Sequence, residues 1–273
     1  NTDRDSYYGP GNDPLKAYGK TTDLTAMGGA QYVHTFDKCF FMPSDLTAGL
    51  EYNRDRLKDN MWGYNRHTDQ TVNIYSAFLQ NEWKNDRWGI LIGGRLDKHN
   101  MVDNVIFSPR ANLRFNPTQN INLRLSYSSG FRAPQAFDED MHIENVGGTV
   151  AMIERAKDLK EEKSQSFSAS ADMYHRFGAF QTNLLIEGFY TRLTDVFVLG
   201  EPYDRGDGIL VKTRSNGPGA KVMGLTLEGK VAYLSILQIQ AGLTLQRSRY
   251  DEPHKWHDDA PAEKARKYSR NPD

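Results

Sequence analysis

The stretch Leu237-Gln238-Ile239-Gln240-Ala241-Gly242-Leu243-Thr244-Leu245-Gln246 alternates apolar residues with polar residues or glycine along its whole length. Successive side chains of a β-strand point to opposite sides, so this segment has one apolar face and one polar face when it is extended. A helix would distribute the same residues around its axis. The alternation therefore predicts a strand whose two sides meet different environments.

The same alternation recurs along most of the chain, in residues 46–52, 88–92, 110–115, 121–128, 167–173 and 223–233. Residues 71–83 follow it less cleanly, because Val72 and Ile74 are out of phase with Tyr75, Ala77 and Leu79. We still expect a strand there. The sequence therefore predicts an all-β protein.

The predicted strands form five hairpins with short turns, most of them rich in Asn, Asp, Pro or Gly. They pair residues 30–38 with 45–57, 70–84 with 87–98, 107–116 with 121–131, 163–176 with 179–199, and 219–234 with 237–250. An eleventh strand is expected near Lys264. The connections between hairpins are long and polar, and comprise residues 58–69, 99–106, 132–162, 200–218 and 251–263.

This regular exchange of short turns and long loops is typical of an outer-membrane β-barrel, with short periplasmic turns and long extracellular loops. A soluble β-sandwich has no reason to place its long loops at one end. We expect the apolar residues Leu237, Ile239, Ala241, Leu243 and Leu245 to face lipid. A polar set is expected to face a wide lumen, because a dry core could not bury it: Arg110, Asn112, Arg114, Asn122, Arg124, Gln238, Gln240, Thr244, Gln246, Glu228 and Lys230. Aromatic residues near strand ends suggest an interfacial girdle.

The composition excludes several classes of protein. The mean hydropathy of −0.69 and the lack of a long apolar run argue against transmembrane helices. A net charge of −1 gives no general attraction for nucleic acid. The single cysteine, Cys39, cannot form an internal disulfide. The N-terminal residues do not resemble a signal peptide, so we expect a mature chain or a fragment. No hydrolase, phosphate-loop or zinc-protease motif is present, so neither an enzyme nor a resident cofactor is expected.

One segment resembles a known family. Ser108-Pro109-Arg110 opens a predicted strand, Pro117-Thr118 lies in the turn, and the next strand ends in Tyr127-Ser128-Ser129-Gly130-Phe131-Arg132-Ala133-Pro134. This pattern resembles the mid-barrel region of TonB-dependent receptors. The segment Asp158-Leu159-Lys160-Glu161-Glu162-Lys163-Ser164 is similar to the opening of the following strand, although Glu161 stands where the family usually has proline. Residues 29–195 are similar to receptors of the Bacteroides group.

The resemblance implies an antiparallel meander that forms part of a barrel of about 22 strands. Residues 1–273 would supply about half of that barrel, with no recognisable plug domain or TonB box. The expected function is TonB-dependent uptake of a scarce nutrient, namely a siderophore, haem or cobalamin. Expected partners are membrane lipid, the chelate ligand, TonB through a plug, and a surface lipoprotein as an optional component. The alternatives are a glycan-importing receptor, a passive outer-membrane channel or a soluble all-β binding module.

Three loops carry candidate ligand groups. Residues 132–162 include Arg132, Asp138, Asp140, His142 and Glu144, and we expect this loop to fold over the barrel mouth with Arg132 bound to a carboxylate at its base. Residues 251–259 include Trp256 and the pair His254 and His257, and this pair could hold a metal beside the neighbouring carboxylates. Residues 62–67 include Trp62, Tyr64 and His67. Each set has a plainer interpretation as a charged, solvated loop or as aromatics resting at the lipid interface. We therefore assign no metal site.

Overall fold

The computed structural model describes residues 1–7, 18–62, 66–135, 144–146, 149–206 and 210–252. These residues form an all-β protein, and 81% of them lie in strands. Among them, no helix is long and apolar enough to cross a membrane. The predicted fold class is confirmed.

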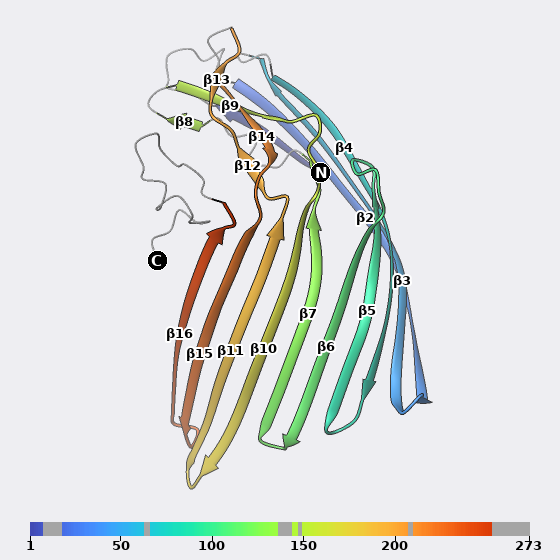
Figure 1. Ribbon diagram of the computed structural model, residues 1–273, viewed down its shortest axis with the longest axis vertical. Coiled ribbons are helices and arrows are strands. Elements are labelled where there is room, and N and C mark those ends of the chain that lie inside the picture. Colours follow the sequence, from blue (N-terminus) through green and yellow to red (C-terminus); the bar gives the residue numbers. More distant parts are fainter. Residues whose placement is uncertain (8–17, 63–65, 136–143, 147–148, 207–209, 253–273) are drawn as a thin grey trace.

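One large sheet forms a curved wall (Figure 1). It contains eleven antiparallel strands in the order β1-β2-β3-β4-β5-β6-β7-β10-β11-β15-β16, so neighbours in sequence along the wall are neighbours in space. The strands are β1 (Thr2–Tyr7), β2 (Tyr18–Cys39), β3 (Met42–Met61), β4 (Arg66–Lys84), β5 (Trp88–His99), β6 (Ile106–Thr118), β7 (Ile121–Arg132), β10 (Glu162–Phe177), β11 (Phe180–Thr194), β15 (Ala220–Tyr233) and β16 (Leu237–Tyr250). This confirms the predicted meander.

A second, smaller sheet lies at the loop end of the wall (Figure 1). It comprises β8 (Glu144–Val146), β9 (Thr149–Arg155), β12 (Phe197–Leu199), β13 (Tyr203–Asp204) and β14 (Leu210–Asn216). Strand β9 pairs with β14 in parallel, which joins the two longest predicted loops into one structure. The predicted loops 132–162 and 200–218 are thus partly ordered as strands.

Several predicted boundaries were wrong. Strands β2, β3 and β4 extend well beyond the predicted segments, so most of the predicted loop 58–69 is strand. The predicted strand 179–199 ends at Thr194, and its last residues belong to β12. Asp195 has a positive φ of 55°, a bend that separates the two strands. The wall's eleventh strand is β1, whereas the strand expected near Lys264 lies outside the described residues.

The two faces of the wall differ as the alternation predicts, and we call them the apolar face and the polar face. The register aligns Tyr127 with Phe167, Leu125 with Ala169 and Leu123 with Ala171 on the apolar face. Leu225, Leu227 and Val231 of β15 are exposed there, whereas Thr226, Glu228 and Lys230 on the polar face are half-buried. A soluble protein would bury the apolar residues, so this exposed apolar wall requires an apolar surrounding.

Aromatic rings form two girdles on the apolar face. The girdle nearer the loops contains Tyr52, Tyr75, Phe107, Tyr127, Phe167 and Tyr190, and the girdle nearer the short turns contains Trp83, Trp88, Phe115, Phe177, Phe180 and Tyr233. The rings pair closely, with centroids 4.8 Å apart for Tyr127–Phe167 and 4.2 Å for Trp88–Phe115. Tyr250, an aromatic residue at the end of β16, is half-buried on the polar face and belongs to neither girdle.

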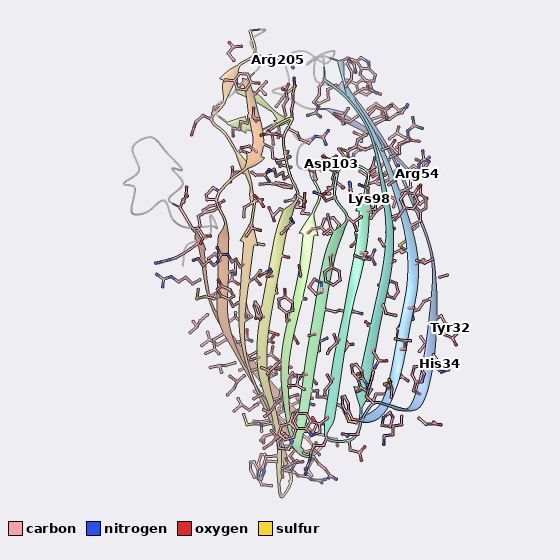
Figure 2. All side chains as sticks on the ribbon, turned by 45° about the vertical axis from the view of Figure 1, so that its right-hand side comes forward. Tyr32, His34, Arg54, Lys98, Asp103 and Arg205 are labelled. Atoms are coloured by element: carbon pink, nitrogen blue, oxygen red, sulfur yellow. The ribbon has the colours of Figure 1, made fainter. Side chains whose placement is uncertain are left out.

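The girdles delimit a band of membrane height. On β10 they are marked by Phe167 and Phe177, ten residues apart. At about 3.3 Å per residue and a tilt of about 40°, that separation is about 25 Å, the height of the apolar band of outer-membrane barrels. Figure 2 shows Tyr32 and His34 projecting from the wall near the short turns, with Arg54 nearer the loops.

Buried apolar residues lie mostly outside this band, toward the loop end. Val102, Ile106 and Ala133 form a small cluster with Phe131 packed against it. Met61, Met152, Val196 and Val211 are almost fully buried as well. The loop end therefore packs like a small soluble domain, and this packing holds the second sheet against the wall.

Candidate ligand-capture site at the loop end

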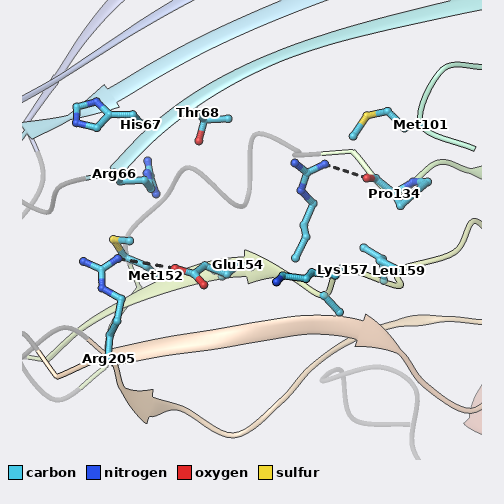
Figure 3. Close-up of a pocket in the computed structure, with 13 residues that line it drawn as sticks. Arg66, His67, Thr68, Met101, Pro134, Met152, Glu154, Lys157, Leu159 and Arg205 are labelled. Carbon is cyan, nitrogen blue, oxygen red and sulfur yellow. Dashed lines mark hydrogen bonds and ion pairs between the residues drawn. The ribbon is translucent and has the colours of Figure 1, made fainter.

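A hollow of about 590 Å³ lies between the start of β4 and strand β9, and we call it the mouth hollow (Figure 3). Its lining comes from β4, the turn after β5, the residue after Ala133, strand β9 with the residues that follow it, and the turn after β13. These residues are Arg66, His67, Thr68, Met101, Pro134, Met152, Ile153, Glu154, Arg155, Ala156, Lys157, Leu159 and Arg205.

A buried ion pair supports one side of the mouth hollow. Arg66 Nη2 donates to Asp59 Oδ2 at 2.6 Å, and Thr21 Oγ1 donates to Asp59 Oδ1 at 2.7 Å. The side chains of Arg66 and Asp59 are 9% and 2% exposed. A buried carboxylate needs such partners, because burial without them costs several kcal/mol. The contacts therefore fix Arg66 in the wall of the hollow and tie β2, β3 and β4 together.

Arg155 joins the second sheet to the large wall. Its Nη1 donates to Gln70 Oε1 at 3.0 Å and to the carbonyl oxygen of Pro134 at 2.9 Å. A dashed line in Figure 3 marks the contact with Pro134. These acceptors come from β4 and from the start of the loop that precedes β8. One guanidinium thus holds three segments that are far apart in sequence. Both of these acceptors are neutral oxygens.

The remaining charges make the mouth hollow basic. Lys157 and Arg205 add two cations, and Arg205 Nη1 lies 3.8 Å from Glu154 Oε1. Among the residues that the structure describes, four cationic side chains line the hollow against one lining carboxylate, with Asp59 behind Arg66 as a second. Such a surface attracts anions, and fixed Arg donors suit carboxylate or phosphate-like oxygens.

His99, the last residue of β5, supports the turn that brings Met101 to the mouth hollow. This side chain is fully buried. Met101 donates its backbone N–H to His99 Nδ1 at 3.0 Å, and His99 Nε2 lies 3.3 Å from Gln135 Oε1. Because Nδ1 accepts, the proton of the neutral ring is on Nε2, which donates to Gln135. The imidazole thus connects the turn after β5 to the start of the loop before β8.

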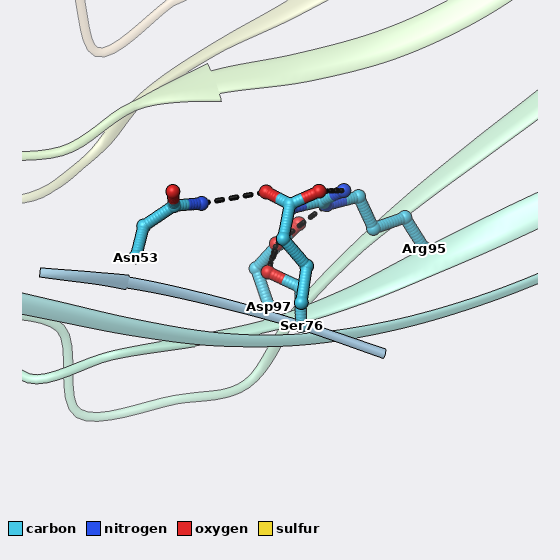
Figure 4. Close-up of polar contacts among 5 residues, drawn as sticks. Asn53, Ser76, Arg95 and Asp97 are labelled. Atoms are coloured by element: carbon cyan, nitrogen blue, oxygen red, sulfur yellow. Dashed lines mark hydrogen bonds and ion pairs between the residues drawn. The ribbon is translucent and has the colours of Figure 1, made fainter. Parts of the chain in front are cut away.

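The polar face below the mouth carries an ordered charge network (Figure 4). Arg95 Nη2 donates to Glu51 Oε1 at 3.1 Å and to Ser76 Oγ at 2.7 Å, and Arg95 Nε donates to Asp97 Oδ1 at 2.8 Å. Asn53 Nδ2 donates to Glu51 Oε1 at 2.5 Å. Two carboxylates share one guanidinium, so this part of the polar face is acidic.

Arginines occupy the neighbouring part of the polar face. Arg114 and Arg124 are direct cross-strand partners, and Arg110 lies opposite Ser128. Like charges placed opposite each other are destabilising unless water or an opposite charge screens them. Serines follow on β10, where Ser166 is aligned with Ser128 and Ser168 with Ser126. This face is therefore built for contact with water or a polar occupant, as expected for a lumen.

The structure describes only some of the predicted ligand residues. Trp62 stacks on Tyr18 with centroids 5.3 Å apart, and His67 lies at the rim of the mouth hollow, where its Nδ1 is 3.0 Å from Asn60 Oδ1. The guanidinium of Arg132 lies 5.6 Å above the centre of the Phe197 ring. Its expected carboxylate contact stays a prediction.

The other candidates are not placed. Glu144 opens β8, and only its backbone is described. Seven lie outside the described residues: Tyr64, Asp138, Asp140, His142, His254, Trp256 and His257. Within the part of the chain that the structure does describe, no group of three or more His, Cys, Asp or Glu is placed to hold a metal ion.

Sequence reasoning missed Arg155, Lys157 and Arg205 as parts of the site. The local sequence around them shows no clear alternation, and no local pattern reveals that β9 pairs in parallel with β14. The loop ends come together through that long-range pairing, which a single sequence does not specify.

Comparison with known proteins identifies the fold. A family model described as "TonB dependent receptor-like, beta-barrel" matches residues 1–273. No curated protein gives a significant match.

Several solved structures share the fold at low sequence identity. The siderophore receptor PirA from Pseudomonas aeruginosa is 17% identical, with a TM-score of 0.70 over 86% of this chain and 44% of that chain. The FrpB iron transporter from Neisseria meningitidis is 15% identical, with a TM-score of 0.62 over 86% of this chain and 36% of that chain. The outer membrane transporter YddB from Escherichia coli is 13% identical, with a TM-score of 0.64 over 85% and 34%.

The chain spans less than half the length of each of these structures. The family consists of bacterial outer-membrane transporters, not enzymes. The soluble binding module that we kept as an alternative is therefore set aside. The exposed apolar band, the two girdles and the match over all 273 residues lead to one conclusion: the chain belongs to the β-barrel family of TonB-dependent receptors.

Proposed function

We propose that this chain forms barrel wall and extracellular loops of a receptor that imports an iron chelate in a TonB-dependent manner, and that the mouth hollow makes early contact with the ligand. Membership of the TonB-dependent receptor family supports the role in the outer membrane. The siderophore receptor PirA and the iron transporter FrpB, which share the fold, support iron over other cargo. Contact with TonB would be made by a plug domain, as the family resemblance implies.

The basic lining of the mouth hollow is the observation that carries the choice of ligand. Arg66, Arg155, Lys157 and Arg205 face a space of about 590 Å³, within the range of small-molecule sites. Arg66 and Arg155 are held rigidly by Asp59, Gln70 and Pro134. Fixed cations lose little entropy when they bind, so they favour ligands with negative charge. We therefore infer an anionic chelate, such as one bearing carboxylate or catecholate groups.

The hollow lies where an incoming ligand would arrive. Long loops of outer-membrane barrels are extracellular, and the hollow is at the loop end of the wall (Figure 1). Below it the polar face continues with Arg95, Glu51 and the arginines of β6 and β7. A ligand released from the hollow would therefore meet a hydrated polar surface along the barrel interior.

A matched pair of double variants tests the proposal in the full-length receptor. Lys157→Gln with Arg205→Gln removes two charges from the hollow. Arg87→Gln with Arg176→Gln removes two exposed charges at the short-turn end. Binding of a radio-iron-labelled anionic chelate should weaken by about tenfold or more in the first pair, on the basis of about 1 kcal/mol per cation, and should be unchanged in the second.

Neutral and cationic chelates serve as the second arm of the test. We expect their binding to change little in the Lys157 and Arg205 variant, because no charge attraction is lost. Equal weakening for all chelates would contradict the assignment of the hollow to an anionic ligand. Uptake that continues after collapse of the proton-motive force would indicate a passive channel, and preferential uptake of haem, cobalamin or an oligosaccharide would replace the iron chelate.

A further inference from the structure

A second group of cations lies on the apolar face, just beyond the girdle nearer the loops. On β10, β11 and β15 the register aligns Gln165 with Arg192 and Arg192 with Lys221. Lys221 is aligned with Arg249 on β16. Lys163 and Arg247 share this face with them, as members of the same alternating rows. We call these five side chains the outer basic patch: Lys163, Arg192, Lys221, Arg247 and Arg249.

The outer basic patch is immediately above lipid-facing residues. Arg192 follows Tyr190 on the same face of β11, Lys221 precedes Met223 on β15, and Arg247 follows Leu245 on β16. A Lys or Arg at this height can lay its methylenes on the apolar surface and place its charge among lipid headgroups. The patch therefore stands just beyond the girdle nearer the loops, and none of its residues lines the mouth hollow.

A hollow of about 630 Å³ borders the patch between β6, β7, β10 and β11. Lys163, Gln165 and Arg192 supply polar groups on one side of it, and Val105, Phe107 and Tyr127 supply apolar surface on the other. The exposed fractions of Val105 and Phe107 are 56% and 60%. A ligand with a charged head and an apolar body fits this division, whereas a free anion would leave the apolar half unused.

Nearby carboxylates offset only part of the charge. Glu161 Oε1 lies 3.0 Å from Lys163 Nζ, and Asp251 accepts from Lys221 Nζ at 2.9 Å and lies 3.6 Å from Arg192. Arg247 and Arg249 have no partner among the described residues. Within the described part of the chain, five cations against two carboxylates leave the patch positive. The side chains of Lys163, Arg192 and Lys221 are about half exposed, so their ion pairs can exchange for an anionic ligand.

We propose that the outer basic patch binds the phosphate groups of a phosphorylated glycolipid in the outer leaflet, with the acyl chains packed on Phe107, Tyr127 and Phe167. The long loops place this end of the wall at the outer leaflet. Lys and Arg at a membrane interface attract anionic headgroups. The lipid would stay bound to this side of the barrel, whether or not the transported ligand is present.

The test uses the delipidated full-length receptor in detergent and native mass spectrometry. The probe is a diphosphorylated, acylated glucosamine disaccharide, offered next to its enzymatically dephosphorylated form. The triple variant Lys163→Gln, Arg192→Gln and Lys221→Gln should bind the phosphorylated lipid at least about tenfold more weakly than the native receptor. The control, Arg110→Gln, Arg114→Gln and Arg124→Gln, removes the same charge from the polar face and should bind it as the native receptor does.

Each outcome decides the proposal. Preference for the phosphorylated lipid that disappears in the outer triple variant supports it, as does failure of excess inorganic phosphate to displace the lipid. Equal binding of the two lipids, or an unchanged affinity in the outer triple variant, would overturn it. Circular dichroism and heat-modifiable migration in gel electrophoresis confirm that both variants are folded barrels.

Discussion

The two faces of β15 and β16 differ in the polarity of their side chains. On one face Leu225 is aligned with Leu245 and Leu227 with Leu243, and these side chains are exposed. On the other face Thr226 is hydrogen-bonded to Thr244 at 3.1 Å, and Lys230 is aligned with Gln240. The same backbone therefore presents one surface to lipid and one to an aqueous interior. An exposed side chain on the apolar face therefore contacts lipid, whereas an exposed side chain on the polar face contacts water.

The largest expected effect concerns a buried charge on the polar face. Asp59→Ala leaves Arg66 without the carboxylate that it contacts at 2.6 Å, and removes the acceptor of Thr21. Breaking a buried pair from one side costs about 3 kcal/mol or more, so we expect a loss of that size in the free energy of unfolding. Denaturant titration of the full-length receptor in lipid vesicles measures it. A loss below about 1 kcal/mol would mean that water already reaches this pair.

The second prediction contrasts the two faces of β16 directly. Leu243→Arg places a charge on the apolar face and should cost about 2–4 kcal/mol near the middle of the membrane. Gln240→Arg places the same charge on the polar face and should cost little. The free energy of unfolding in lipid vesicles again gives both values. Similar costs for the two substitutions would contradict the assignment of the faces.

The third prediction compares the effect of an added methyl group at one glycine on each face. A Cβ added to Gly224, on the polar face, would lie 2.5 Å from the Phe189 ring and 2.7 Å from the carbonyl oxygen of Leu245. A Cβ added to Gly229, on the apolar face, would meet nothing within 4 Å. Gly224→Ala should therefore cost about 1–3 kcal/mol, and Gly229→Ala should be close to neutral. The reverse order in unfolding experiments would show that Phe189 does not pack over Gly224.

The smallest effect is expected for an exposed ion pair. Asp69 lies 3.4 Å from Lys58 and 3.9 Å from Arg56, and all three side chains are about half exposed. Asp69→Asn should change the free energy of unfolding by less than about 1 kcal/mol, and salt should reduce the change further. A loss as large as that of Asp59→Ala would indicate that these charges form a buried network in the complete barrel.

Much of the wall could be predicted from the sequence because its signal is local. The alternation around Leu237–Tyr250 gives the same answer in every short window, and the hairpin turns fix which strands are neighbours. The long extensions of β2, β3 and β4 were missed because they lie above the membrane. There the surrounding is aqueous on both sides, so polar residues such as Lys58 and Asp59 on adjacent positions show no apolar alternation.

The candidate site could be predicted only in part. The loop 132–162 was expected at the barrel mouth, and β9 within it does line the mouth hollow. The partners of that strand come from residues 210–214, and such long-range parallel pairing has no signature in either segment alone. Arg155 is informative for the same reason, since its acceptors on Gln70 and Pro134 belong to segments that only the tertiary fold brings together.

The most direct test of the account is an accessibility scan of residues 121–127 in the full-length receptor. Each position is replaced in turn by a spin-labelled cysteine, in a Cys39→Ser background and in lipid vesicles. Labels at Ile121, Leu123, Leu125 and Tyr127 should collide mainly with oxygen, which dissolves in lipid, and labels at Asn122, Arg124 and Ser126 mainly with a water-soluble nickel chelate. A period of two in this ratio is the predicted result. A uniform ratio, or the opposite phase, would contradict the claim that the apolar face of the wall contacts the membrane.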